Sequence, residues 1–167
     1  MSQLKVNSIV PAGGLPSGAN GGILQDVQAV KTDTFSFTGT SFTDITGLSA
    51  SITPSSSSNK VLIVAQIYMS ADSSRDTAKI NFVRGSTNIA QPSGSVAQTS
   101  TMMNYLSAIT MFPMSMNFLD SPATTSATTY KLQIGKDGTN NKICLNRYSE
   151  ADNYHGISTL TLYEVTA

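Results

Sequence analysis

The sequence predicts an all-β fold: an antiparallel β-sandwich, jelly-roll-like, with an extended N-terminal arm. Residues 61–69 are wholly apolar on one side of an extended strand and half apolar on the other, as expected for a central strand with little solvent contact. Several other segments alternate apolar and polar residues with a period of two. No apolar pattern of helical period runs for more than two turns, and the eight to ten expected strands suit a sandwich of antiparallel sheets.

The first 22 residues differ from the rest of the chain. Leu4, Val6 and Ile9 form a short apolar stretch, and a dense run of glycine and proline follows it, which prevents regular structure. We expect residues 1–22 to be an arm that becomes ordered only against a partner, with these three apolar residues as its docking contacts. A flexible linker is the alternative, and the apolar stretch argues against it. Residues 23–167 then form the β-sandwich domain.

The first half of that domain contains the strands that lead to the central one. Extended segments are expected at residues 23–31, 34–38, 41–46 and 48–52. Phe42, Ile45, Leu48 and Ile52 supply core contacts only if the chain has a bulge or a break near Gly47. A polar connection over residues 54–59 then leads into the central strand.

The second half of the domain continues with a strand at residues 77–84, whose alternation places Lys79 and Asn81 outward. A tight turn at residues 84–87 and a polar loop over residues 91–101 follow. Five of the seven methionines lie between residues 102 and 116, where they fit a core or a subunit interface better than a ligand site. Pro113 is expected to divide this stretch into strands at 106–112 and 115–119. The next inward side chains are Tyr130, Leu132 and Ile134, and a turn at 135–138 leads to a strand at 142–146.

The last expected strand, residues 157–165, is apolar on both faces. Ile157 and Tyr163 lie on one face, and Leu160 and Leu162 lie on the other. A strand of this kind sits in the middle of a sheet or packs against another subunit. These four residues are therefore the candidates for an oligomer interface.

Composition excludes several classes of protein. Only 12% of the residues are charged, ten basic and ten acidic, so the chain lacks the basic patch of a nucleic-acid-binding protein. The 24 serines and 20 threonines predict a surface of hydroxyl groups, which suits secreted or virion β-proteins. The single cysteine, Cys144, allows no intramolecular disulfide, and we expect it to be a buried core residue. We find no signal peptide and no membrane span, which predicts synthesis in a cytoplasm without membrane insertion.

The sequence offers no convincing catalytic, cofactor or metal site. The only histidine, His155, lies near Asp152 in a turn, but no Gly-x-Ser-x-Gly motif would present a serine to it. Two carboxylate pairs, Asp72 with Asp76 and Glu150 with Asp152, match no calcium-loop pattern and lie in turn-like segments. We therefore predict no enzyme, no cofactor and no metal ion.

The chain as a whole resembles small tail-fibre and virion structural proteins of tailed bacteriophages, particularly those of marine and cyanobacterial hosts. The residues that carry the resemblance are strand and turn patterns: Leu4-Lys5-Val6-Asn7-Ser8-Ile9, Ser51-Ile52-Thr53-Pro54 with Ser55 to Ser58 and Lys60-Val61-Leu62, Val83-Arg84-Gly85-Ser86-Thr87, Asp120-Ser121-Pro122 with Thr128 and Tyr130, Asn146-Arg147, and Ser158-Thr159-Leu160-Thr161-Leu162-Tyr163-Glu164. The resemblance implies a β-sandwich module, commonly a homotrimer, that is held on the particle through its N-terminal segment.

Two functions remain as expectations. The first is a non-enzymatic virion protein, of tail-fibre or capsid-decoration type, whose arm (residues 1–22) docks on another phage tail or capsid protein. The alternative is a host-attachment module that binds a surface glycan, because Tyr148, Glu150, Asp152, Asn153 and Tyr154 combine aromatic, acidic and amide groups as sugar sites do. The polar loops at residues 70–76, 91–101 and 135–141 would contribute to such a site. A polysaccharide-degrading tailspike would need paired carboxylates in a groove, usually on a much longer chain.

Overall fold

The computed structural model describes residues 22–72, 76–94, 99–106, 110–137, 142–148 and 154–166. Within these residues the chain forms strands and no helix, which confirms the predicted all-β class. The strands are β1 (Ile23–Lys31), β2 (Phe35–Phe37), β3 (Thr43–Ile52), β4 (Lys60–Ala71), β5 (Asp76–Arg84), β6 (Thr87–Ile89), β7 (Thr101–Leu106), β8 (Phe112–Asp120), β9 (Thr128–Lys136), β10 (Ile143–Leu145) and β11 (Ser158–Val165). Leu4, Val6 and Ile9 of the expected arm lie outside the described residues.

The first sheet is built around β4, the strand that the sequence identifies as central. β11 and β8 pair with opposite edges of β4, and β1 pairs with the outer edge of β11, all antiparallel. The short strands β10 and β2 continue the lines of β11 and β1, because Met69 of β4 pairs with Leu145 of β10 on one side and with Phe112 of β8 on the other.

The second sheet has the order β3-β9-β5, with β6 and β7 sharing the remaining edge of β5. Phe82 near the end of β5 pairs with Ile89 of β6, whereas Ile80 pairs with Thr101 of β7. All of these pairs are antiparallel.

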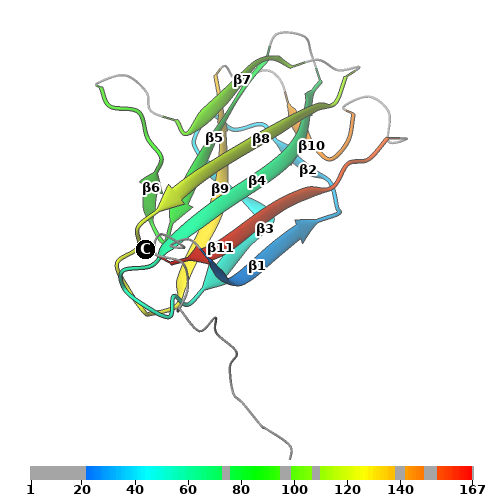
Figure 1. Cartoon of the computed structure of the whole chain (residues 1–167). Coiled ribbons are helices and arrows are strands. Elements are labelled where there is room, and N and C mark those ends of the chain that lie inside the picture. The colour runs from blue at the N-terminus through cyan, green and yellow to red at the C-terminus, as the bar shows by residue number, and fades with distance from the viewer. Residues whose placement is uncertain are drawn as a thin grey trace, which may run out of the picture.

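The two sheets face each other as the layers of a jelly roll. The long strands stand in the order β1-β11-β4-β8 in one layer and β3-β9-β5-β7 in the other (Figure 1). The chain crosses between the layers after β2, β3, β4, β7, β8 and β9, and this alternation is typical of the two Greek keys of a jelly roll.

The core lies between the two layers and follows the predicted alternation. The inward residues of β4 have no exposed surface, and these are Val61, Ile63, Ala65, Ile67 and Met69. They pack with inward residues of β3, β5, β9 and β11, among them Leu48, Ile80, Leu132 and Leu162. Cys144 is buried and free, as its expected core role requires.

The predicted irregularity at Gly47 is present inside β3. The register between β3 and β9 shifts between Asp44 and Ser49, and Gly47 has a φ of 88°. A positive φ of this size favours glycine because it has no Cβ. Ile45, Leu48 and Ile52 all reach the core on either side of this bulge.

One local expectation was wrong. Pro113 does not divide two strands but lies second in β8, which is an edge strand where proline is tolerated. Asn81 lies on the outer face of β5, as its alternation with the core residues Ile80 and Phe82 predicts, but it is buried there because the connection after β6 folds over β5. There Ser100 N donates to Asn81 Oδ1 at 3.0 Å and Gln91 Nε2 donates to the same oxygen at 3.4 Å.

Candidate functional site

The sandwich has two different ends. We call the end where β1 begins the entry end; it holds Gly22, the connections 53–59 and 121–127, and the turn at Gly85. The opposite, distal end is where β4 finishes and β11 begins, and the described residues 146–148 and 154–157 lie there (Figure 1). Both ends hold buried polar groups: Asn146 binds the carbonyl oxygen of Lys31 and the hydroxyl of Ser158 at the distal end, and two buried carboxylates lie at the entry end.

Glu164 is the first centre of this entry end. Its side chain points inward at the end of β11 and has no exposed surface. One carboxylate oxygen accepts hydrogen bonds from Ser55 N and Oγ at 2.7 Å and from Asn59 Nδ2 at 2.6 Å, and the other accepts from Gln25 Nε2 at 2.6 Å. Burial raises the pKa of Glu164, but these donors outweigh it and bring that pKa down to about 2. The carboxylate thus stays ionised and ties the 53–59 connection to β1 and β11.

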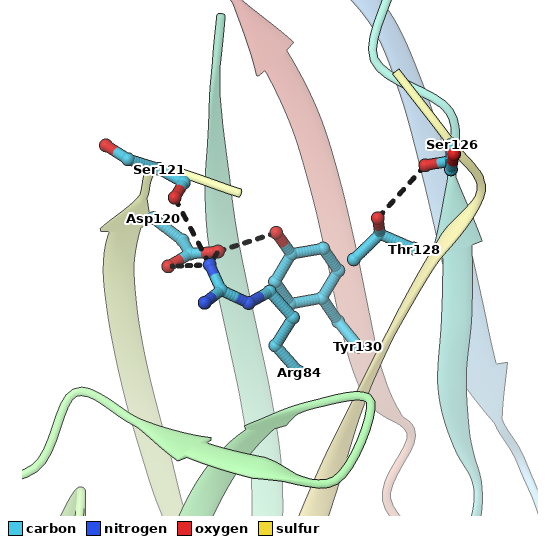
Figure 2. A network of polar contacts seen from close by, with 6 residues as sticks. All are labelled: Arg84, Asp120, Ser121, Ser126, Thr128 and Tyr130. Carbon is cyan, nitrogen blue, oxygen red and sulfur yellow. Dashed lines mark hydrogen bonds and ion pairs between the residues drawn. The ribbon is translucent and has the colours of Figure 1, made fainter. Parts of the chain in front are cut away.

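Asp120 is the second centre and connects the two sheets. Arg84 Nη1 donates to both Asp120 oxygens, at 3.0 and 2.8 Å, and to the carbonyl oxygen of Ser121 at 3.2 Å. The hydroxyl of Tyr130 donates to Asp120 Oδ2 at 2.7 Å (Figure 2). Arg84 and Tyr130 are paired neighbours in the second sheet, whereas Asp120 ends β8 in the first. Burial and the bond to Asp120 raise the pKa of the Tyr130 hydroxyl, so it remains a donor at neutral pH.

The two acids occupy one row of the first sheet. Val61 of β4 pairs with Glu164 on one side and with Asp120 on the other. Both carboxylates therefore cap the same edge of the core, and each has its own set of donors. The donors compensate the buried negative charges of both carboxylates, which would otherwise destabilise the fold strongly.

A pocket of about 360 Å³ lies beside Arg84 at the entry end. Its walls are Arg84, Gly85, Pro122, Thr124, Ala127, Thr128 and Thr129. Thr128 Oγ1 donates to the carbonyl oxygen of Ser126 at 3.0 Å (Figure 2). The pocket is formed by the connection between β8 and β9, by the start of β9, and by Arg84 and Gly85 at the end of β5. Its lining contains threonine hydroxyls and one guanidinium group, which can bind a ligand but include no activated nucleophile.

The distal end brings together part of the predicted glycan site. The rings of Tyr148 and Tyr154 are 5.1 Å apart between centroids and tilted by 58°, and Tyr154 is 61% exposed. His155 is exposed and lies next to Arg147 in an isolated bridge. Glu150, Asp152 and Asn153, the other predicted members of the glycan site, lie outside the described residues.

The four predicted interface residues fall into two groups. Leu160 and Leu162 point into the core and have no exposed surface in the single chain, so their side chains offer nothing to a second subunit. Ile157 is 55% exposed, and Tyr163 lies half-buried on the outer face of the first sheet. The inner face of β11 is therefore apolar because it packs into the core of the sandwich.

Sequence reasoning missed Glu164 and Asp120, although their patterns contain a signal. Each acid continues an inward apolar alternation, Leu160 and Leu162 before Glu164, and Met116 and Phe118 before Asp120. An acid at the next inward position must find donors inside the protein. Arg84 and Tyr130 could not be assigned as those donors because the strand pairing that brings them near was unknown.

Comparisons with known proteins identify no family for this chain. No family model matches the chain, and no curated protein matches its sequence. The structure is similar to one of infectious bursal disease virus, Gx strain, with a TM-score of 0.41 and 18% identity over 87% of this chain and 39% of that chain. It is also similar to one of T=1 particles derived from that virus, with a TM-score of 0.42 and 16% identity over 87% of this chain and 37% of that chain. This chain spans less than two fifths of those neighbours, and its fold assignment rests on its own strand order.

The described residues contain neither a membrane-spanning helix nor a metal-binding cluster. No helix there is long and apolar enough to cross a membrane. No group of three or more His, Cys, Asp or Glu side chains in those segments could hold a metal ion.

Proposed function

We propose that this chain is a non-enzymatic structural component of a bacteriophage virion, of tail-fibre or capsid-decoration type. Residues 1–22 would hold it on another particle protein, and the sandwich would be displayed outward. The host glycan hypothesis is retained below as a second function of the same displayed domain.

The observation that carries this proposal is the difference between the two ends of the sandwich. β1 begins at the entry end, where Glu164 and Asp120 fasten the connections to the sheets. Residues 146–148 and 154–157 lie at the other end of the strands, with Tyr154 exposed. An attachment segment that enters at a stiffened end leaves the opposite end free to face outward, which is the geometry that a displayed module needs.

The surface chemistry supports the same role. The outer face of the second sheet carries hydroxyl groups and paired charges, including Ser51 with Thr129 at 2.7 Å and Lys131 with Asp44 at 2.7 Å. Such a face stays soluble without a large net charge. The bacteriophage resemblance of the sequence agrees with this reading.

The test is whether the protein is part of purified particles. Virions of the virus that encodes the chain would be purified by density gradient and probed by mass spectrometry and immunogold labelling. We expect the full chain in the particles, and a version lacking residues 1–22 to be produced and folded but absent from them. Absence of the full chain from purified virions would contradict a structural role.

Glycan binding at the distal end is favoured by the tyrosine pair. An exposed aromatic ring supported by a second ring is a stacking surface for a sugar. A glycan array should detect binding by the full chain and its loss in Tyr154→Ala. Ile157→Ala, another exposed residue at this end, is the matched control and should keep binding. Equal binding by both variants would exclude Tyr154 from a site.

A further inference from the structure

The outer face of the first sheet is unusually apolar for an exposed surface. Tyr163 of β11 pairs with Leu62 of β4, which pairs with Leu119 of β8, and all three point away from the core. Leu119 is 47% exposed, and Ile23 at the start of β1 is 62% exposed. Contiguous apolar surface of this kind usually marks an interaction site.

The outer face of the second sheet differs in composition. It carries the ion pair of Lys131 with Asp44 across β9 and β3, and the pair of Lys79 with Asp137 next to β5. Low charge is thus a property of the outer face of the first sheet and not of the whole surface of the described chain. Of the two outer faces in the described part of the chain, that of the first sheet is therefore the better suited to an apolar protein contact.

The charges on the apolar face indicate which partner fits. Asp26 of β1 lies opposite Tyr163, and Lys60 of β4 lies opposite Val165. The face therefore carries an acid on one side of β11 and a base on the other. When two copies pack face to face about a two-fold axis along β11, β1 of one copy lies over β4 of the other. Asp26 of one copy and Lys60 of the other are then offset by two residues, about 7 Å along the strands. A lysine side chain can span that separation.

We propose that this outer face binds a second copy of the chain, with β11 over β11 and Asp26 of each copy near Lys60 of the other. The apolar side chains Tyr163, Leu62 and Ile23 fill the contact, and the charges lie at its border. A two-fold contact of this kind is self-complementary, so it closes at two subunits. It differs from the homotrimer that the bacteriophage resemblance implies, which would need a head-to-tail contact. The inference rests on the face alone and holds whether or not the chain belongs to a virion.

The first measurement is the mass of the full chain in solution by light scattering. We expect about twice the chain mass of 17.6 kDa at micromolar concentration. Leu62 points outward, so Leu62→Lys should leave the circular dichroism spectrum unchanged and reduce the mass to that of a monomer. Ser51→Lys, on the outer face of the second sheet, is the matched control and should remain a dimer.

A charge exchange tests the geometry of the contact. Asp26→Lys places two like charges near each other and should weaken dimerisation about tenfold, whereas the double variant Asp26→Lys, Lys60→Asp should restore it. A monomeric wild type, a trimer, a Leu62→Lys variant that stays dimeric, or a double variant without restored binding would overturn the proposal. So would a monomeric full chain whose shortened form starting at Gly22 dimerises, since residues 1–21 would then be the occupant of the face.

Discussion

Glu164 and Asp120 show how two residues can determine the structure of one end of a sandwich. Each lies at an inward position of its strand, where alternation predicts an apolar side chain. A buried carboxylate is stable only when donors replace its water, and here amides, hydroxyls and a guanidinium group do so. The connections that supply those donors are thereby held against the core.

Removing the charge of Glu164 should destabilise the domain. In Glu164→Gln the new amide NH₂ group opposes the donors that bind the carboxylate, and we expect a loss on the order of 2–3 kcal/mol in the free energy of unfolding at pH 7. Urea unfolding measures it. The pKa of Glu164 is about 2 in the folded chain and 4.5 in the unfolded one, so its contribution is complete above pH 4.5 and is lost as the pH falls toward 2. The difference between wild type and variant should shrink over that range, and a constant difference would contradict this assignment.

The hydroxyl of Tyr130 is expected to contribute less, because Arg84 still neutralises Asp120 without it. Tyr130→Phe removes only the 2.7 Å bond to Asp120, and the free energy of unfolding should fall by about 1–2 kcal/mol. Asp120→Ala leaves the Arg84 guanidinium group without a carboxylate and the tyrosine hydroxyl without its acceptor, and it should remove about 3–5 kcal/mol. Tyr163→Phe, on the outer face, is the control and should change stability by less than about 0.5 kcal/mol. Equal losses in Tyr130→Phe and Tyr163→Phe would show that the buried bond from Tyr130 to Asp120 adds no stability.

At the scale of single strands, the sequence predicts best where burial decides. β4 and β9 alternate as expected because one face of each meets the core. The bulge at Gly47 was predicted because the spacing of core residues on either side requires it. The effect of Pro113 was predicted wrongly because it depends on whether β8 is an edge strand. The local sequence does not contain that information.

Gly47 provides a test of the bulge in β3. A Cβ at this position would make ordinary van der Waals contact with Lys31, whose nearest atoms are 3.7 Å away, and would clash with nothing, so Gly47→Ala probes the positive φ. We expect a loss of about 1–2 kcal/mol in the free energy of unfolding, measured with urea. Ser49→Ala, an exposed position in the same strand, should be close to neutral. A neutral Gly47→Ala would mean that the bulge can relax without glycine.

The candidate site could be predicted only in part, for a physical reason. Tyr148 and Tyr154 are close in sequence, so a turn is enough to bring them together. Arg84, Asp120 and Tyr130 meet only because strands from both sheets end at the same edge of the sandwich. Contacts of this kind depend on strand order, and the residues alone predict a sandwich without specifying that order.

For the molecule as a whole, the layers and the core are formed by residues that follow the arm. β1 starts at Ile23, and every strand of both sheets lies between Ile23 and Val165. Thr166 N donates a backbone hydrogen bond to Gly22 O at 3.2 Å, which joins the residue before the first strand to the residue after the last one. The sandwich therefore has the parts of an independently folding domain.

A chain that begins at Gly22 should accordingly fold by itself. We expect one cooperative thermal transition with a midpoint within about 2 °C of the full chain, because the core and its two buried carboxylates are retained. Circular dichroism and calorimetry give the comparison, and a chain beginning at Gln28 is the control that should unfold at lower temperature, since it loses half of the β1–β11 pairing and the Gln25 bond to Glu164. A much lower midpoint for the Gly22 chain would mean that residues 1–21 stabilise the sandwich directly. The arm would then be part of the domain, and its release to dock on another protein would cost the domain that stability.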